Sequence, residues 1–207
     1  MFEFLTGATN DDAIAIIKND HDKVKGLFEQ FERAEDLRSK KKIAAEAIME
    51  LKIHAEIEEK IFYPSVRNGV EEGLMNEADE EHHVAKLLIA ELEQMDASDD
   101  HWEAKFTVLS ENIRHHIREE EGNMLPQARR LDVDFGAVGR KLLATKTELK
   151  KNGIPLCDEE KLMKRNARSD SPAKAAKKAS AKILPHTRAK KPSTSKKISH
   201  HPRKASY

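Results

Sequence analysis

Histidine and glutamate residues recur at matched spacings along the sequence. The segments His54–Pro64 and His116–Pro126 share the pattern His-x-x-x-Glu-Glu, with a proline ten residues after the histidine, and the offset between them is 62 throughout. Another histidine precedes each segment by 33 or 34 residues: His21 comes before the first, and His82 or His83 before the second. The chain therefore looks like a duplicated helix pair, in which each pair supplies two histidines and one His-x-x-x-Glu motif.

This spacing has a direct chemical consequence. Residues four apart lie on one face of a helix, so each motif presents an imidazole and a carboxylate side by side. Two glutamates and four histidines directed into one interior are either costly unpaired polar groups or metal ligands. A nitrogen and oxygen donor set without sulfur suits iron or manganese, and helical bundles build dinuclear sites in their interiors. We therefore expect a metal site.

The elements that must position these residues are helices. Apolar residues recur in steps of three and four in four runs, at about residues 14–31, 43–62, 74–95 and 100–126. Asn10, Asp11 and Asp12 offer N-cap oxygens to the first run, and Asp100 with Glu103 resembles a capping box before the fourth. A short fifth helix is expected at roughly 135–150. Because the connections are short, the prediction is an all-α, antiparallel up-down-up-down four-helix bundle over residues 10–152.

Composition agrees with this class and excludes others. Charged residues make up 36% of the chain and aromatic residues 5%, which is typical of helices with solvated faces and not of a β-sandwich. The single cysteine, Cys157, excludes an intramolecular disulfide and any cysteine-based zinc or iron–sulfur site. No basic and apolar leader is expected at the N-terminus and no segment suits a bilayer, so the expected compartment is the cytoplasm.

Charge divides the chain into two parts. Residues 161–207 contain 15 basic side chains and one acidic, whereas the other 160 residues contain 22 basic and 36 acidic, so the net charges are +14 and −14. We expect a linker at 153–168 and a disordered tail rich in Lys, Ala, Ser and Pro at 169–207. Clustered positive charge attracts nucleic acid without sequence specificity, so residues 169–204 are a candidate nucleic-acid segment. The alternative is that the tail docks on its own acidic bundle.

The chain resembles the hemerythrin-like (HHE cation-binding) family over about residues 10–150. The resemblance is carried by Asn19–His21, His54–Pro64, Glu81–His83 and His115–Pro126. It implies a non-haem centre of two iron ions, bridged by carboxylates and by an oxo, hydroxo or water bridge. By this pattern the ligands would be His21, His54, Glu58, His82, His116 and Glu120.

The sequence departs from the oxygen-carrying hemerythrins in two places. They have His-x-x-x-His in the third helix, where this chain has Lys86 and Leu87, and they end the fourth-helix motif with His-x-x-x-x-Asp, where this chain has Glu120 and Glu121. Fewer histidines leave coordination positions to water or an exogenous ligand. We therefore expect a protein that binds or senses O₂, nitric oxide, peroxide or iron. The alternative is a di-iron enzyme that turns over peroxide or nitric oxide.

Two ligand positions have competing candidates. The constant offset of 62 favours His83, whereas the apolar stripe through Ala85, Leu88 and Leu92 favours His82, which we prefer because periodicity reports side-chain direction. The internal repeat favours Glu120 over Glu121. The remaining polar neighbours are expected to be solvated (Glu59, Glu119, Glu121) or to lie at the surface or outside the ligand set (His83, His115), and Cys157 is expected to be an inert thiol beyond the bundle.

Overall fold

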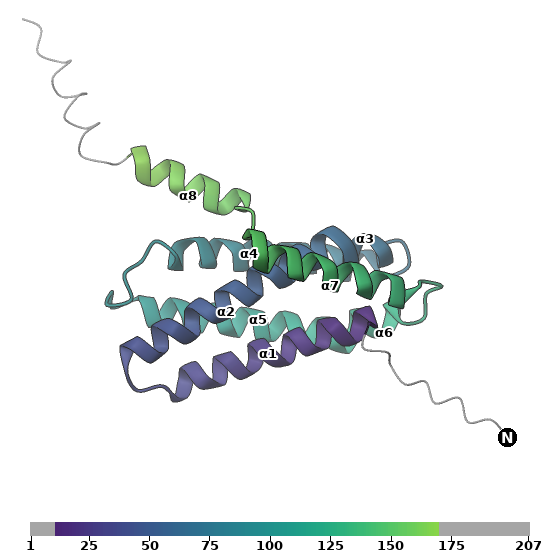
Figure 1. Cartoon of the computed structure of the whole chain (residues 1–207), viewed down its shortest axis with the longest axis horizontal. Helices are drawn as coiled ribbons and strands as arrows, with labels where there is room; N and C mark the ends of the chain where they lie inside the picture. The colour runs from purple at the N-terminus through teal and green to yellow at the C-terminus, as the bar shows by residue number, and fades with distance from the viewer. Residues whose placement is uncertain (1–10, 170–207) are drawn as a thin grey trace, which may run out of the picture. The chain divides into compact units, whose positions relative to one another are not determined.

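The structure is a computed structural model that describes residues 11–169, with side chains to residue 165 (Figure 1). Within this range every regular element is a helix and no strand occurs. The helices are α1 (Ala13–Arg33), α2 (Leu37–Ile57), α3 (Tyr63–Val66), α4 (Glu72–Leu92), α5 (Trp102–Glu119), α6 (Leu125–Ala128), α7 (Phe135–Asn152) and α8 (Asp158–Ser169). The predicted tail lies outside the described residues from 170 onward. Among the helices described, none is long and apolar enough to cross a membrane.

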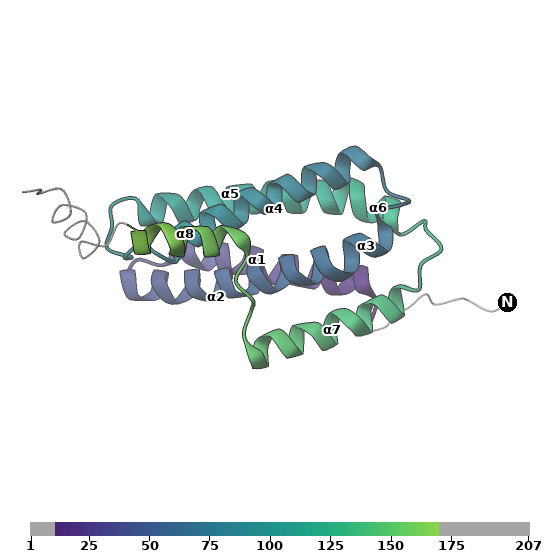
Figure 2. The same cartoon turned by 90° about the horizontal axis from the view of Figure 1, so that it is seen from above.

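The four long helices α1, α2, α4 and α5 lie alongside one another in both views (Figures 1 and 2). α1 packs mainly against α2, and α4 against α5, so the two halves of the sequence repeat form two helix pairs. α7 occupies the region predicted for a fifth helix and packs on α1 and α2. This arrangement directs one face of each long helix toward a common interior.

Helix starts follow the local capping chemistry, with one correction. Asp12 accepts a hydrogen bond from the backbone N–H of Ala15 (3.1 Å), which confirms the predicted cap of α1. The predicted capping box at Asp100 is wrong. α5 begins at Trp102, and Asp99 accepts from the backbone of His101 (2.9 Å) through its side chain and from Trp102 through its carbonyl. The residue before α5 is thus His101, which makes no side-chain cap, and Asp99 and Asp100 lie in the turn that precedes it.

Both His-x-x-x-Glu-Glu motifs end in a wider π-helical turn, Glu58–Phe62 and Glu120–Met124. The backbone N–H of Tyr63 donates to the carbonyl of Glu58 five residues earlier, and Leu125 does the same to Glu120. A proline, Pro64 or Pro126, lies two residues after each turn and has no N–H to continue the ladder. The extra residue in the turn lets two consecutive glutamates approach the interior, and such turns are frequent at functional sites.

The interior consists of two apolar clusters. One includes Phe28, Phe31 and Phe106 near the α1–α2 and α4–α5 connections, and the other includes Ile17, Phe62 and Leu142 toward α3, α6 and α7. The buried histidines and glutamates fall between the two clusters along each long helix, as His21 does between Ile17 and Val24. A polar layer therefore crosses an otherwise apolar core.

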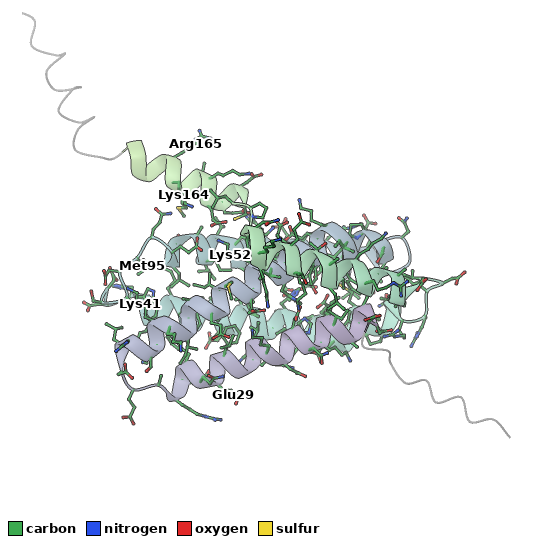
Figure 3. The ribbon with its side chains drawn as sticks, in the orientation of Figure 1. Glu29, Lys41, Lys52, Met95, Lys164 and Arg165 are labelled. Atoms are coloured by element: carbon green, nitrogen blue, oxygen red, sulfur yellow. The ribbon has the colours of Figure 1, made fainter. Side chains whose placement is uncertain are left out.

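The segment after α7 returns to the bundle. Gly153 adopts a positive φ of 90° and turns the chain away from α7. Glu160 of α8 then pairs with Lys52 of α2 at 2.7 Å, and Nδ1 of His83 of α4 lies 2.7 Å from Oε1 of Glu159. Figure 3 draws the side chains and labels Lys52 on α2 and Lys164 on α8. The region predicted as a linker thus contains α8, whose first turn contacts the helices around the polar layer.

Candidate metal centre

All six residues predicted as ligands are buried in the polar layer. The four histidines come from α1, α2, α4 and α5, and each glutamate opens one of the π-helical turns. None of these side chains is more than 7% exposed; they are His21, His54, Glu58, His82, His116 and Glu120. The structure brings them together, and their assignment as ligands remains a prediction.

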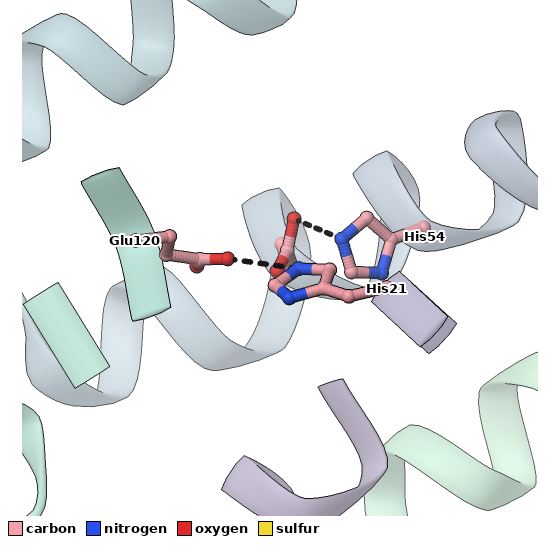
Figure 4. A group of neighbouring side chains, drawn as sticks. His21, His54 and Glu120 are labelled. Atoms are coloured by element: carbon pink, nitrogen blue, oxygen red, sulfur yellow. Dashed lines mark ion pairs between the residues drawn. The ribbon is translucent and has the colours of Figure 1, made fainter. Parts of the chain in front are cut away.

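The first group contains His21, His54, Glu58 and Glu120, whose donor atoms all lie within 4.8 Å of one another (Figure 4). The Nε2 atom of His21 is 3.1 Å from Oε2 of Glu120, and Nε2 of His54 is 3.1 Å from Oε2 of Glu58. Each helix pair of the repeat thus contributes a carboxylate, while both histidines come from the first pair.

The second group contains Glu58, His82 and His116. Nε2 of His82 lies 3.3 Å from Oε2 of Glu58 and 3.3 Å from Nε2 of His116. Glu58 belongs to both groups, and Oε2 of Glu120 extends to within 3.9 Å of His116. The carboxylates therefore lie between two clusters of imidazoles, as a pair of bridged ions would require.

Several donor atoms of this layer are buried without a hydrogen-bond partner. They are Nε2 of His21, both ring nitrogens of His54, and both oxygens of Glu58 and of Glu120. Although some lie near 3.1 Å from each other, their geometry is not that of a hydrogen bond. Burying so many unpaired polar atoms is costly unless a cation satisfies them. The residues present therefore fit a bound metal.

A carboxylate lies behind each of the four rings, at its Nδ1 atom. The pairs are His21 with Glu121 (2.9 Å), His54 with Asp20 (3.6 Å), His82 with Glu59 (3.0 Å) and His116 with Glu81 (2.8 Å). Carboxylates behind metal-binding imidazoles set the ring tautomer and orientation. Here they leave the Nε2 atoms directed at the centre.

The tautomers give an independent argument for a cation. An Nδ1 atom that donates its proton to a carboxylate leaves Nε2 of a neutral ring with a lone pair. For neutral His82 and His116 rings the two Nε2 atoms then face each other at 3.3 Å. Such contacts repel unless a positive charge lies between them.

The two central carboxylates differ in their electrostatics. Burial, followed by the charge of Glu120, raises the pKa of Glu58 well above its usual range. Burial acts against ionisation of Glu120 too, but the His21 ring 3.1 Å away and the charge of His116 lower its pKa to about 2. Burial also lowers the pKa of His54 to about 4, which keeps this ring neutral.

The competing candidates lie in different surroundings. His82 is buried in the second group, whereas His83 is 51% exposed and lies 2.7 Å from Glu159 of α8. Glu120 is buried, whereas Glu121 is 29% exposed and lies behind His21. The geometry supports His82 and Glu120, as the apolar stripe and the internal repeat favoured.

A largely apolar cavity of about 40 Å³ borders the layer. Its lining includes His54, His82 and His116, with Leu51, Ile89 and Ile113 around them. The chain after α7 supplies Ile154, Pro155, Cys157 and Glu160. This volume exceeds the minimum needed to hold a water molecule.

Several residues near the centre were missed or misplaced by sequence reasoning. Glu59 and Glu121 were expected to be solvated, which is wrong, because each lies behind a buried ring. Cys157 was expected beyond the bundle but lines the cavity, where burial raises the pKa of its thiol to about 12. The hydroxyl of buried Tyr63 lies 3.4 Å from Nε2 of His82. The only local signal for Glu59 and Glu121 was the doubled glutamate in each motif.

Lysines neutralise three of the four carboxylates behind the rings. Lys86 of α4 pairs with Glu59, and Lys146 of α7 pairs with Asp20. Lys25 of α1 lies 3.5 Å from Glu121. Lys86 lies where the oxygen-carrying hemerythrins have a histidine. Here its side chain pairs with Glu59 and is not one of the candidate ligands.

The fold and the layer define a class: over the described residues this is an all-helical protein whose long helices direct histidines and glutamates into one buried centre. A sequence model of the hemerythrin HHE cation binding domain matches residues 12–128. The chain therefore belongs to the hemerythrin HHE cation-binding family.

The chain is also similar to two known proteins. A crystal structure of a hemerythrin HHE cation binding domain-containing protein from Mycobacterium kansasii has the same fold, with a TM-score of 0.60 and 23% identity over 68% of this chain and 88% of that one. A Nostoc sp. protein described as a DNA nickase is 26% identical over 133 residues, which are 64% of this chain and 35% of that protein. This chain thus spans about a third of the length of that curated relative.

Proposed function

We propose that this protein holds two iron ions in the polar layer and uses them to bind or sense a small ligand. His21 and His54 would bind one ion, His82 and His116 the other, and Glu58 and Glu120 would bridge them. The observation that carries the proposal is the set of buried, unpartnered donor atoms directed at one centre. The donor set contains nitrogen and oxygen without sulfur, which fits iron.

Iron in such a centre supplies coordination positions and redox chemistry to a small molecule. The protein supplies the surroundings. The second group has three donor residues against four in the first, and the apolar cavity borders its two histidines. The buried Tyr63 hydroxyl lies beside the same group, and burial raises its pKa well above the usual range, so it remains a neutral hydrogen-bond donor. These features favour an O₂-, nitric oxide- or peroxide-sized ligand at the second group.

The test is elemental analysis with an ultraviolet–visible spectrum under air, nitric oxide and reductant. We expect about two iron per chain and a spectrum that changes with nitric oxide. Because Glu58 belongs to both groups, Glu58→Gln should lower the iron content to one or fewer per chain, while Glu111→Gln, at an exposed site on α5, should leave it unchanged. A purified chain that neither contains iron nor takes it up would contradict the proposal.

The alternative is an enzyme that turns over peroxide or nitric oxide at the same centre. The open coordination of the second group and its cavity favour this alternative too. Steady-state assays on iron-loaded protein decide between the two, with free iron at equal concentration as the control. Turnover no faster than that of free iron removes the enzymatic alternative.

A separate proposal concerns the basic tail, which would bind nucleic acid non-specifically through residues 169–204. The division into net charges of −14 and +14 supports it. Deleting residues 170–207, which leaves α8 intact, should abolish DNA retention and preserve iron content. Equal DNA retention by the truncated and full chains would refute it.

A further inference from the structure

A second cluster of metal-binding side chains lies at the surface between α4 and α5. Glu77 and Glu81, one turn apart on α4, and His115 of α5 each offer a donor atom within 4.8 Å of the others. Glu77 and His115 are exposed, whereas Glu81 is only 12% exposed. The cluster therefore extends from the exposed surface to Glu81, which lies at the outer edge of the polar layer.

Glu81 connects this cluster to the buried centre. Its Oε2 atom accepts from Nδ1 of His116 at 2.8 Å, while its Oε1 atom lies 3.5 Å from Nε2 of the exposed His115. One carboxylate thus contacts a ring of the buried layer with one oxygen and a surface imidazole with the other.

Glu81 also differs from its three counterparts. Asp20, Glu59 and Glu121, the other carboxylates behind the rings, each pair with a lysine. Among the ion pairs of the described residues, Glu81 has histidines only. Its charge is therefore not neutralised by a fixed cation from the protein.

Two residues of the cluster, Glu77 and Glu81, line a small cavity of about 10 Å³. His116 and Glu120 of the buried layer line the same cavity. Glu120 is 1% exposed and neither of its oxygens has a hydrogen-bond partner. An unsatisfied buried carboxylate therefore borders the same space as the surface carboxylates, and no lysine or arginine lines that space among the described residues.

We propose that Glu77, Glu81 and His115 form an entry site for a divalent cation, from which the ion passes to Glu120 and His116 of the buried centre. The donors are two carboxylates and one imidazole, a set that binds Fe²⁺, Mn²⁺ or Co²⁺ and leaves positions for water. Such a site binds weakly and exchanges fast because two of its three residues are exposed. The loading role rests on the proposed metal centre, whereas the surface site itself does not.

The loading role is tested by the rate of Fe²⁺ uptake into metal-free protein, followed anaerobically by stopped flow. The double variant Glu77→Gln/His115→Asn should load at least about fivefold more slowly and reach the same final iron content and spectrum. Glu80→Gln, on an exposed neighbouring position of α4, is the matched control and should load at the wild-type rate. A double variant that loads as fast as wild type, or one that loses iron at equilibrium, would overturn the entry role.

The surface site is tested apart from the buried centre by Co²⁺ titration of a His54→Ala/His82→Ala variant, which removes one histidine from each buried group, with circular dichroism to check its helix content. We expect one weak Co²⁺ site in this variant and its loss when Glu77→Gln/His115→Asn is added. If wild type takes up no iron but this weak site is present, the proposed function fails and the surface site stands. If Glu77→Gln/His115→Asn does not change Co²⁺ binding, the surface site is refuted.

Discussion

At the scale of single residues, the centre depends on groups that do not touch the ion. Each buried ring has a carboxylate at its Nδ1 atom, and three of these carboxylates pair with a lysine in turn. At the contact between Glu59 and His82, burial and hydrogen bonding act in opposite directions on the pKa of the carboxyl. Burial opposes ionisation of Glu59, but hydrogen bonds with His82 and Lys86 lower its pKa to about 2, so it is charged at any physiological pH.

Glu59→Gln should therefore weaken metal binding without removing a predicted ligand. The amide still fills the space, but it no longer holds the His82 tautomer through a charged acceptor. We expect about tenfold lower affinity at one of the two ions, within the range seen for such partners. Competition with a chromogenic chelator measures this affinity. The exposed Glu111→Gln variant should match wild type, and equal affinity in Glu59→Gln would show that the carboxylate has no influence on the ion.

At the scale of elements, α7 and α8 extend the family domain that ends near residue 128. α7 approaches the start of α1 so closely that a Cβ at Gly139 would lie 1.6 Å from the backbone oxygen of Asp11. α8 is held at its first turn by Glu160, which accepts from Lys52 at 2.7 Å and from the backbone of Cys157 at 3.0 Å. The contacts of Glu160 lie at the cavity, which Cys157 and Glu160 both line.

Two glycine substitutions test the packing of α7. Gly139→Ala should lower the free energy of unfolding by about 2 kcal/mol, because the added methyl meets backbone that cannot move independently. Gly26→Ala, in the interior of α1 where a Cβ meets nothing within 4 Å, should raise it by about 0.5–1 kcal/mol through helix propensity. Urea denaturation measures both. A neutral Gly139→Ala variant would mean that α7 does not dock closely on α1.

The attachment of α8 should depend on pH. Burial acts to raise the pKa of Glu160, but Lys52 and Glu93 lower it from 4.5 to about 2. A depressed acid pKa stabilises the folded chain above the ordinary value and loses this effect as the pH falls toward the depressed one.

Glu160→Gln should therefore increase amide exchange in residues 157–165 by about tenfold at pH 7. The difference from wild type should shrink as the pH falls from about 4.5 toward 2. Asp158→Asn, on the exposed side of the same turn, serves as the control. An exchange difference that grows in acid would contradict the assigned role of Glu160.

At the scale of the whole molecule, the polar layer joins all four long helices, because each contributes a histidine to it. An ion bound there links α1, α2, α4 and α5 at once, whereas without an ion the layer interrupts the apolar core. A ligand that binds only the folded chain stabilises it by mass action, by about 2.7 kcal/mol at a hundred times its dissociation constant.

Removing iron should therefore lower the melting temperature of the whole domain by about 5–10 °C in a single transition. Adding Fe²⁺ should restore it, whereas Mg²⁺ should not, because Mg²⁺ prefers oxygen ligands. Differential scanning calorimetry with and without chelator measures the change. A melting temperature that does not respond to iron would show that the layer is stable without an ion.

Sequence alone determined the helical class, the approximate positions of the four long helices and of α7, and the inward direction of the four histidines and two glutamates, whereas α8 lies in the region predicted as a linker. These properties are local, since they follow from steps of three and four residues along a helix. The tertiary structure decided which carboxylate lies behind each ring, because those contacts join residues 23, 35 and 100 positions apart. It also decided that Cys157 lines the cavity, and that Glu81 is the one carboxylate of the four behind the rings with no lysine partner among the described residues. The sequence around a glutamate on a helix surface does not show which helix packs beside it.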